Sequence, residues 1–273
     1  MRLWMIGCGN MGSAMLERWI ASGTVAAGDV FVANRRDRAL PGDVRQGRPL
    51  PDEAAPDVVV LGVKPQQLGE AAAAHAAKVA GAPLLVSMLA GVDPAALARA
   101  FPGPAAVQTM PNLPVALGRG VVAVHAPGIG AEARAATDRL LAPLGLVAWC
   151  DEAARFAAVG ALSGTGPAFL FRFVDALAAG GAAIGLDRDE ATRLALATVE
   201  GAALMAAASD RTPAALADAV ASPGGMTREG LNVLDADRAL ETLLEETLRA
   251  VARRQDEMAA AAREDGSGGE DRR

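Results

Sequence analysis

The residues best suited to chemistry form the turn Ser222-Pro223-Gly224-Gly225-Met226-Thr227, which leads directly into a predicted helix. The first backbone N–H groups of a helix lack helical partners and lie at the positive end of its dipole, so they bind anions such as carboxylates. The two glycines let a ligand approach, and the Thr227 hydroxyl can donate a hydrogen bond to a reacting atom. We therefore expect a site for a small carboxylate; the alternative is that Ser222 or Thr227 only caps a structural helix.

A second group of residues has the spacing of a dinucleotide-binding turn. The apolar run Leu3–Ile6 predicts a short strand, and Gly7-Cys8-Gly9-Asn10-Met11-Gly12 follows it and opens an amphipathic helix. In this pattern the first glycine makes the tight turn, the second lets the backbone approach a pyrophosphate, and the third allows close packing of helix on strand. The cofactor-binding residues expected here are Gly7, Gly9, Asn10, Met11 and Gly12.

The residues after the next predicted strand, Val30–Ala33, indicate which dinucleotide is bound. Chains that bind NAD usually carry an acidic residue here for the ribose 2′-hydroxyl, whereas this chain has Asn34, Arg35 and Arg36. Two guanidinium groups and an amide suit a 2′-phosphate, so NADPH is expected, with NADH left open. The alternative is that both arginines are solvated loop charges.

Composition and spacing exclude several other classes. The net charge is −6, tyrosine is absent and aromatic residues make up 3% of the chain, so a nucleic-acid-binding surface is not expected. Two cysteines and two histidines lie apart, without metal-ligand spacing, so neither a metal site nor a disulfide scaffold is expected. The chain starts directly in a strand and its long uncharged stretches contain prolines or glycines, which predicts a cytoplasmic protein without a membrane span.

The order of the elements predicts an α/β domain followed by an all-α domain. Residues 1–151 read as a Rossmann-type, doubly wound parallel sheet, because apolar runs alternate with helical segments. The expected strands are Leu3–Ile6, Val30–Ala33, Val58–Val63, Leu84–Met88, Ala105–Thr109, Val121–Val124 and Leu146–Trp149. Residues 152–263 have helical periodicity. The expected helices are Glu152–Leu162, Pro167–Ile184, Arg188–Ala208, Pro213–Ala221, Thr227–Leu234 and Arg238–Arg263.

The helical half is rich in alanine and nearly apolar all round its helices, so these helices must be buried. A domain of about 110 residues has limited interior to bury them. We therefore expect a homodimer, or a larger oligomer built from dimers, with a self-contained bundle as the alternative. Residues 264–273 are charged and rich in glycine, which predicts a disordered tail.

Further ligand contacts are expected in the turns that follow the strands, because open α/β sheets bind ligands at the carboxyl ends of their strands. The cofactor contacts assigned to these turns are Val63, Lys64, Pro65, Ala90 and Gly91. Lys64 would reach a cofactor phosphate or ribose, although a solvated loop lysine is an equal alternative. Asn112, after the next strand, would hold the nicotinamide or the substrate.

Together these motifs resemble the pyrroline-5-carboxylate reductase family, which catalyses the last step of proline biosynthesis. The most specific matches are residues 161–169 and 222–227, which are similar to the family's Ala-Leu-Ser-Gly-Ser-Gly-Pro-Ala-Tyr and Ser-Pro-Gly-Gly-Thr/Ala-Thr. Supporting matches are Gly9-Asn10-Met11, Val63-Lys64-Pro65, Ala90-Gly91, Met110-Pro111-Asn112 and Gly201-Ala202-Ala203. The resemblance covers about residues 3–260 and implies a Rossmann domain that binds NAD(P)H and a helical dimerisation domain.

The resemblance implies an oxidoreductase that reduces the C=N bond of 1-pyrroline-5-carboxylate to give L-proline. The backbone N–H groups of Gly225, Met226 and Thr227, with Ser222, would hold the carboxylate, and Gly224 would let it approach. Thr227 is the expected catalytic residue, hydrogen-bonded to the ring nitrogen, and Ser163 is assigned to the substrate site. No general acid is evident, and an imine that arrives protonated needs none, so catalysis would depend on the alignment of donor and acceptor carbons.

The chain departs from the family pattern at several positions. Polar residues are replaced at Leu113, Phe169, Ala197 and Ala221, and Gln108 stands where arginine is common. The exact imine is therefore open. The alternatives are a diverged imine reductase for another cyclic imino acid and a non-catalytic NADP-binding scaffold. A β-hydroxyacid dehydrogenase would need a catalytic lysine on the helix predicted at Pro167–Ile184, and that segment has none.

Overall fold

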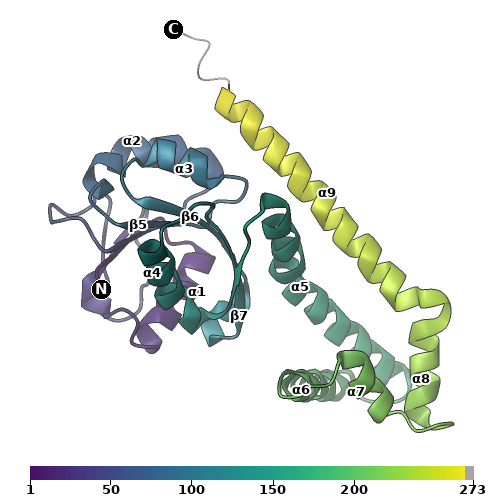
Figure 1. Cartoon of the computed structure of the whole chain (residues 1–273). Coiled ribbons are helices and arrows are strands. Elements are labelled where there is room, and N and C mark those ends of the chain that lie inside the picture. The colour runs from purple at the N-terminus through teal and green to yellow at the C-terminus, as the bar shows by residue number, and fades with distance from the viewer. Residues whose placement is uncertain (268–273) are drawn as a thin grey trace. The chain divides into compact units, whose positions relative to one another are not determined.

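The computed structural model describes residues 1–267 of the 273-residue chain, which divides into two compact units (Figure 1). Unit 1 comprises residues 1–165 together with the described residues from 251 onward, and unit 2 comprises Gly166–Ala250. Helices α5 (Ala153–Ala183) and α9 (Ala239–Ser267) each contribute residues to both units. The boundary expected after residue 151 coincides with the turn before α5, whereas the units divide within α5.

Unit 1 is built on an eight-stranded sheet with the strand order β3-β2-β1-β4-β5-β6-β7-β8. The strands are β1 (Leu3–Ile6), β2 (Val30–Ala33), β3 (Arg45–Gly47), β4 (Val58–Leu61), β5 (Leu84–Ser87), β6 (Ala105–Pro111), β7 (Gly120–His125) and β8 (Gly145–Trp149). The strand order reverses between β1 and β4, both of which pair in parallel with their neighbours. Such a reversal is where open α/β sheets bind ligands.

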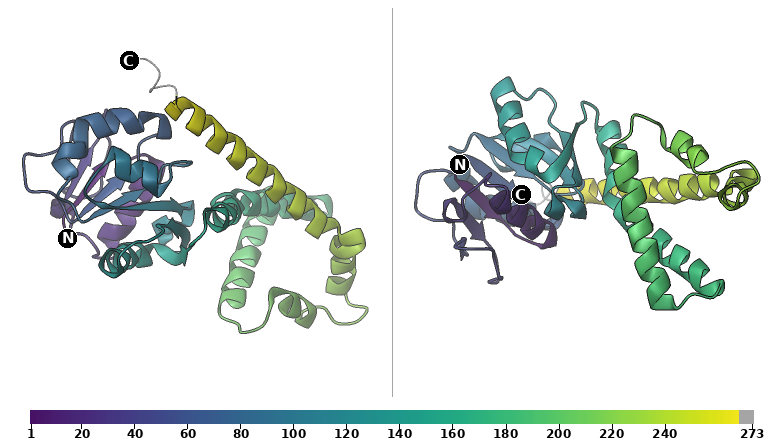
Figure 2. Two further views of the ribbon diagram at one scale, coloured as in Figure 1. Left: turned by 45° about the horizontal axis from the view of Figure 1, so that its top comes forward. Right: turned by 90° about the horizontal axis from the view of Figure 1, so that it is seen from below.

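Helices cover both faces of this sheet, which is why its central strands are continuous apolar runs (Figure 1, Figure 2). On one face α1 (Asn10–Ala21) and α4 (Ala131–Leu141) pack with Leu3 and Met5 of β1. On the other face α2 (Leu68–Val79) and α3 (Pro94–Ala100) pack with Trp4 and Ile6. Alternate side chains of a single strand therefore pack into the two hydrophobic cores on opposite faces of the sheet. The predicted fold class, an α/β unit followed by an all-helical unit, is confirmed.

The sheet is not wholly parallel, and the expectation of a parallel sheet is wrong at one pair. β7 runs antiparallel to β6. Residues 112–119 between them form only a short 3-10 helix, η3 (Leu113–Leu117), and the turn that follows. A parallel crossover needs a dozen or more residues, so this connection can only reverse the chain. The edge strand β3 was not expected either, because its residues are polar or small and largely exposed.

Helix α5 corrects a second expectation, that of separate helices ending at Leu162 and starting at Pro167. The structure has one helix from Ala153 to Ala183, with Pro167 inside it. Proline has no N–H to donate to the carbonyl four residues earlier, which belongs to Ser163. Asn112 Nδ2 donates to that carbonyl oxygen instead, at 2.9 Å, so the helix continues without an unpaired acceptor.

Unit 2 has a small interior of its own. Its helices are α6 (Arg188–Ala207), α7 (Pro213–Ala219) and α8 (Met226–Asp235), together with parts of α5 and α9. The buried cluster contains only small side chains and valines: Val174, Ala178, Ala191, Ala195 and, partly buried, Val199. Large apolar side chains on α5 and α6 stay exposed in the single chain, among them Leu170, Phe171, Phe173, Leu194, Leu204 and Met205. The helices of a single chain therefore leave large apolar side chains uncovered, unlike the self-contained bundle that was the alternative to a homodimer.

Two features bear on expectations about the ends and surroundings of the chain. Of the described helices, α5 is long and apolar enough to cross a membrane by length and composition, with a mean hydropathy of 1.3 over its most apolar window. One such helix is weak evidence for a span, since an apolar helix of a soluble protein meets the same criteria.

Helix α9 continues to Ser267, past the start of the tail expected from residue 264. Residues 268–273 of that expected tail lie outside the described residues.

Candidate active site

The glycine turn after β1 meets three different steric demands. Gly7 has a φ of +83°, and a Cβ there would lie 2.8 Å from both Cγ1 and N of Val63, so only glycine fits. Gly9 has open space where a Cβ would stand. A Cβ on Gly12 would lie 3.2 Å from Met5 Cε, which shows how closely α1 packs on β1. These are the turn, the open approach and the close packing that a dinucleotide site requires.

Helix α1 begins at this turn without a side-chain cap. Gly9 is the N-cap residue, and the first helical hydrogen bond runs from Ser13 N to Gly9 O at 2.8 Å. The N–H groups of Asn10, Met11 and Gly12 therefore point out of the first turn with no helical acceptor. An N-terminus of this kind attracts the negative charge of a phosphate.

A cavity of about 370 Å³ lies at the carboxyl ends of the central strands. Its lining comes from the glycine turn, from the turns after β4 and β5, and from the carboxyl half of β6: Gly9, Asn10, Met11, Gly12, Gly62, Val63, Met88, Leu89, Ala90, Gln108, Thr109, Met110 and Pro111. The structure thus brings Val63 and Ala90 together with the glycine turn, as the sequence predicts. Lys64, Pro65 and Gly91 adjoin the lining in sequence, and Lys64 is exposed at the N-cap of a short 3-10 helix (Pro65–Gln67).

The residues expected to read the 2′-phosphate have different surroundings from one another. Asn34 Oδ1 accepts a hydrogen bond from Cys8 N at 2.9 Å, and its buried Nδ2 has no partner in the described part of the chain. The Arg35 guanidinium pairs with Glu70 in the first turn of α2. Arg36 is exposed. Arg38 was not among the expected site residues, yet its Nη1 donates to Cys8 O at 2.8 Å.

These observations fit a bound dinucleotide. A buried donor without a partner, an uncapped helix start and a glycine with free space all lie around one turn. The Cys8 thiol in this turn is buried, and its burial raises its pKa above the ordinary value, so it stays protonated at neutral pH. No group of three metal-ligating side chains occurs among the residues that were described.

The second predicted site, Ser222–Thr227, lies in unit 2. Gly224 has a φ of +68°, and Gly225 N donates to Ser222 O at 2.9 Å to close the turn. Gly225 is the N-cap residue of α8, and no side chain caps this helix. The alternative, in which Ser222 or Thr227 only caps a structural helix, is therefore wrong. The N–H groups of Met226 and Thr227 remain available for an anion.

Two features of this turn suit ligand binding. The side chains of Ser222, Met226 and Thr227 are exposed in the chain, Met226 at 94%. Arg228, in the first turn of α8, forms an ion pair of 2.8 Å with Asp218 of α7 and so fixes one helix start to its neighbour. The cofactor-side residues lie in unit 1, and this turn lies in unit 2.

Asn112 and Ser163 are brought together, but through bonds that serve the fold. Asn112 is buried; its Nδ2 donates to Ser163 O, and its Oδ1 accepts from Val121 N at 2.8 Å. The Ser163 hydroxyl donates to Val159 O at 2.7 Å, one turn earlier in α5. Each polar end of Asn112 thus has a protein partner, and the assignment of both residues to a ligand stays a prediction.

The departures from the family pattern lie in different surroundings. Leu113 and Ala197 are exposed in the chain, Phe169 is half-buried and Ala221 is buried. Gln108 is the one of these replaced positions that lines the cavity, where it is 7% exposed. An uncharged amide thus stands in the wall where the family commonly has a guanidinium.

Comparison with known proteins identifies the family. Residues 153–258 match the model described as pyrroline-5-carboxylate reductase dimerisation, and residues 2–91 match that of NADP oxidoreductase, coenzyme F420-dependent. The pyrroline-5-carboxylate reductase of Synechocystis sp. is 36% identical over 94% of this chain and 98% of that protein, and the Pseudomonas aeruginosa enzyme is 33% identical over 94% and 97%. The chain belongs to the pyrroline-5-carboxylate reductase family. This confirms the resemblance seen in the sequence.

Solved structures of the pyrroline-5-carboxylate reductase family share the fold of this chain. The Coxiella burnetii pyrroline-5-carboxylate reductase has a TM-score of 0.82 at 27% identity and covers 94% of this chain and 97% of its own. A Plasmodium falciparum pyrroline carboxylate reductase, solved with NADP bound, has the same TM-score at 23% identity over 94% and 98%. The exposed apolar side chains of α5 and α6 fall inside the segment that matches the dimerisation model.

Proposed function

We propose that this protein reduces 1-pyrroline-5-carboxylate to L-proline with NADPH. The observation that carries the proposal is the start of α8, where a glycine N-cap leaves backbone N–H groups uncapped beside the exposed hydroxyl of Thr227. A small ring that carries a carboxylate next to an imine nitrogen matches these two kinds of group: the N–H groups suit the carboxylate and the hydroxyl suits the nitrogen. Membership of the pyrroline-5-carboxylate reductase family over nearly the whole chain supports the same reaction.

In this proposal the turn in unit 2 binds and orients the substrate. The N–H groups of Met226 and Thr227 and the hydroxyl of Ser222 hold the carboxylate, and the lack of a side chain at Gly224 and Gly225 keeps the approach open. The Thr227 hydroxyl oxygen accepts a hydrogen bond from the N–H of the protonated ring nitrogen and fixes the face that the C=N carbon presents. The nitrogen arrives protonated, so its new lone pair needs no enzymic acid.

The residues of unit 1 hold the cofactor. The uncapped start of α1 faces the pyrophosphate, and the cavity beside Gln108 takes the nicotinamide end. When bound, reduced nicotinamide supplies a hydride to the imine carbon. The protein's contribution is then alignment: holding two reacting carbons in contact removes much of the entropic barrier.

The proposal includes a homodimer that works in the cytoplasm. Exposed side chains such as Phe171 and Met205 support burial of α5 and α6 against a second copy, because many large apolar side chains left exposed on two helices are typical of subunit contacts. The match of residues 153–258 to a dimerisation model supports the same arrangement.

The deciding experiment is a steady-state assay of the purified protein that follows NADPH consumption with 1-pyrroline-5-carboxylate, with its six-membered homologue piperideine-6-carboxylate and with NADH in place of NADPH. Turnover that is fastest with the five-membered ring supports the proposal. Faster turnover of the homologue would instead make this a diverged imine reductase. Tight NADPH binding without turnover of any cyclic imine would make it a scaffold.

A further inference from the structure

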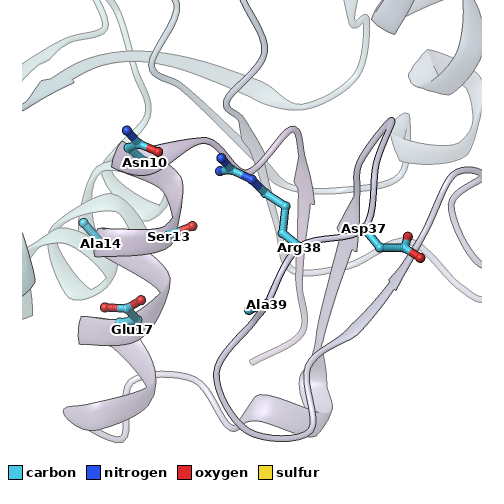
Figure 3. A pocket seen from close by; sticks show the side chains of 7 residues that line it. All are labelled: Asn10, Ser13, Ala14, Glu17, Asp37, Arg38 and Ala39. Carbon is cyan, nitrogen blue, oxygen red and sulfur yellow. The ribbon is translucent and has the colours of Figure 1, made fainter.

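The connection between β2 and β3 has no helix. Residues 34–44 run as a loop from the end of β2 to the start of β3, whereas parallel strands are usually joined through a helix. A cavity of about 590 Å³ opens between this loop and α1 (Figure 3). Its lining residues are Asn10, Ser13, Ala14 and Glu17 from α1 and Asp37, Arg38 and Ala39 from the loop.

Arg38 is held at this cavity from both its backbone and its side chain. Its N–H donates to Gln46 Oε1 at 3.1 Å, and its carbonyl accepts from Gln46 Nε2 at 2.9 Å, so β3 fixes its position. Its Nη1 donates to Cys8 O, inside the glycine turn. Figure 3 shows the guanidinium extended toward the first turn of α1, near Asn10 and Ser13, while the Asp37 carboxylate points away from them.

The charges around the cavity favour an anion at its Asn10 end. Arg35 pairs with Glu70 and Arg36 is exposed, whereas the guanidinium of Arg38 contacts the glycine turn at Cys8 O. A guanidinium has five N–H donors, and Cys8 O takes one of them. Glu17 lies one helical turn beyond Ser13, which disfavours an anion at the opposite end.

We propose that Arg38, with Ser13 and Asn10, binds the 2′-phosphate of NADPH and sets the preference for NADPH over NADH. This rests on the proposed use of a nicotinamide dinucleotide. The pyrophosphate belongs at the start of α1 and the adenosine ribose beside the end of β2, where Asn34 bonds the glycine turn, so a 2′-substituent points toward this loop. A fork of N–H groups binds phosphate oxygens in pairs, and serine adds a hydroxyl donor.

The test measures nucleotide affinity directly, without the imine reaction. Adenosine 2′,5′-bisphosphate and adenosine 5′-monophosphate are titrated calorimetrically into the full chain and into Arg38→Ala, with Arg48→Ala as the control. Arg48 is exposed beyond β3 and carries the same charge, outside the cavity. Arg38→Ala should weaken the bisphosphate about tenfold or more and leave the monophosphate unchanged, because one charge-assisted contact is lost.

Arg38 also holds the glycine turn, so a second variant is needed. Ser13→Ala leaves the bond to Cys8 O in place and should weaken the bisphosphate selectively, by less than Arg38→Ala does. Equal loss of both nucleotides in Arg38→Ala, or a selective loss that appears only in Arg35→Ala or Arg36→Ala, would overturn the inference. If the wild type binds the bisphosphate selectively but reduces no cyclic imine, the inference stands and the proposed reaction falls.

Discussion

Asn112 replaces a hydrogen bond that Pro167 removes from helix α5, because its Nδ2 lies 2.9 Å from the carbonyl oxygen of Ser163. Its Oδ1 at the same time accepts from Val121 N in β7. One buried side chain thus joins the end of β6, the next strand and a helix that would otherwise break. The segment that resembles a family motif, residues 161–169, is therefore one whose helical form depends on a residue far away in the sequence.

Replacing Asn112 with alanine should lower the free energy of unfolding by about 2 to 4 kcal/mol, because it leaves a carbonyl and an N–H group unpaired in the interior. The midpoint of urea unfolding, followed by far-UV circular dichroism, measures the change. The matched control is the double variant Asn112→Ala/Pro167→Ala, in which residue 167 regains an N–H for Ser163. Recovery of about half the loss is expected. A double variant no more stable than Asn112→Ala would contradict this account of the helix.

Two glycines of the first turn should respond differently to alanine. Gly9→Ala introduces a Cβ into open space, so stability should stay within about 0.5 kcal/mol while NADPH affinity falls at least about tenfold. Gly7→Ala places a Cβ against Val63 at a positive φ, so it should destabilise the fold itself. Thermal unfolding and calorimetric NADPH binding, measured on both variants, separate the two effects. Similar unfolding midpoints for both variants would contradict these roles.

The exposed face of α5 offers a test of assembly. Phe171 is 64% exposed in the single chain and lies in the segment that matches the dimerisation model. Phe171→Glu should weaken self-association at least about tenfold, since it would bury an unpaired charge. Sedimentation over a range of concentrations measures this. Leu146→Glu, on the exposed edge strand β8 outside that segment, is the control and should associate like the wild type. Unchanged association of Phe171→Glu would remove this face from the contact.

Local patterns predicted much of the fold. β1 and β2 have the bounds expected from their sequences, because their buried apolar runs end at a glycine or a polar residue. Strand β7 was expected, but its antiparallel direction was not, although the short connection before it indicates a reversal of the chain. β3 carries no apolar pattern, so nothing local marks it as a strand. The continuity of α5 through Pro167 could not be predicted, since the bond that allows it comes from Asn112.

The candidate site likewise has parts that the sequence predicts and parts that it does not. The glycine turn and the start of α8 could be predicted because their chemistry lies within a few consecutive residues. The pairing of Arg35 with Glu70 and the reach of Arg38 to Cys8 depend on how separate segments pack, so neither contact could be predicted from the sequence. The assignment of Arg35 to the cofactor stays a prediction. One feature of the loop of residues 34–44 could have been predicted: it is too short to hold the helix that usually connects two parallel strands.

The most direct test of the central claim compares the wild type with Thr227→Ala in the reduction of 1-pyrroline-5-carboxylate by NADPH. The account predicts that kcat falls about tenfold to a hundredfold, because a hydrogen bond to the reacting group is lost, while calorimetric NADPH affinity is unchanged. Thr227→Ser should restore most of the rate, and Thr247→Ala, which removes a half-buried hydroxyl that donates to Leu243 O in α9, should not differ from the wild type. Wild-type turnover in Thr227→Ala, or loss of NADPH affinity with it, would contradict the account.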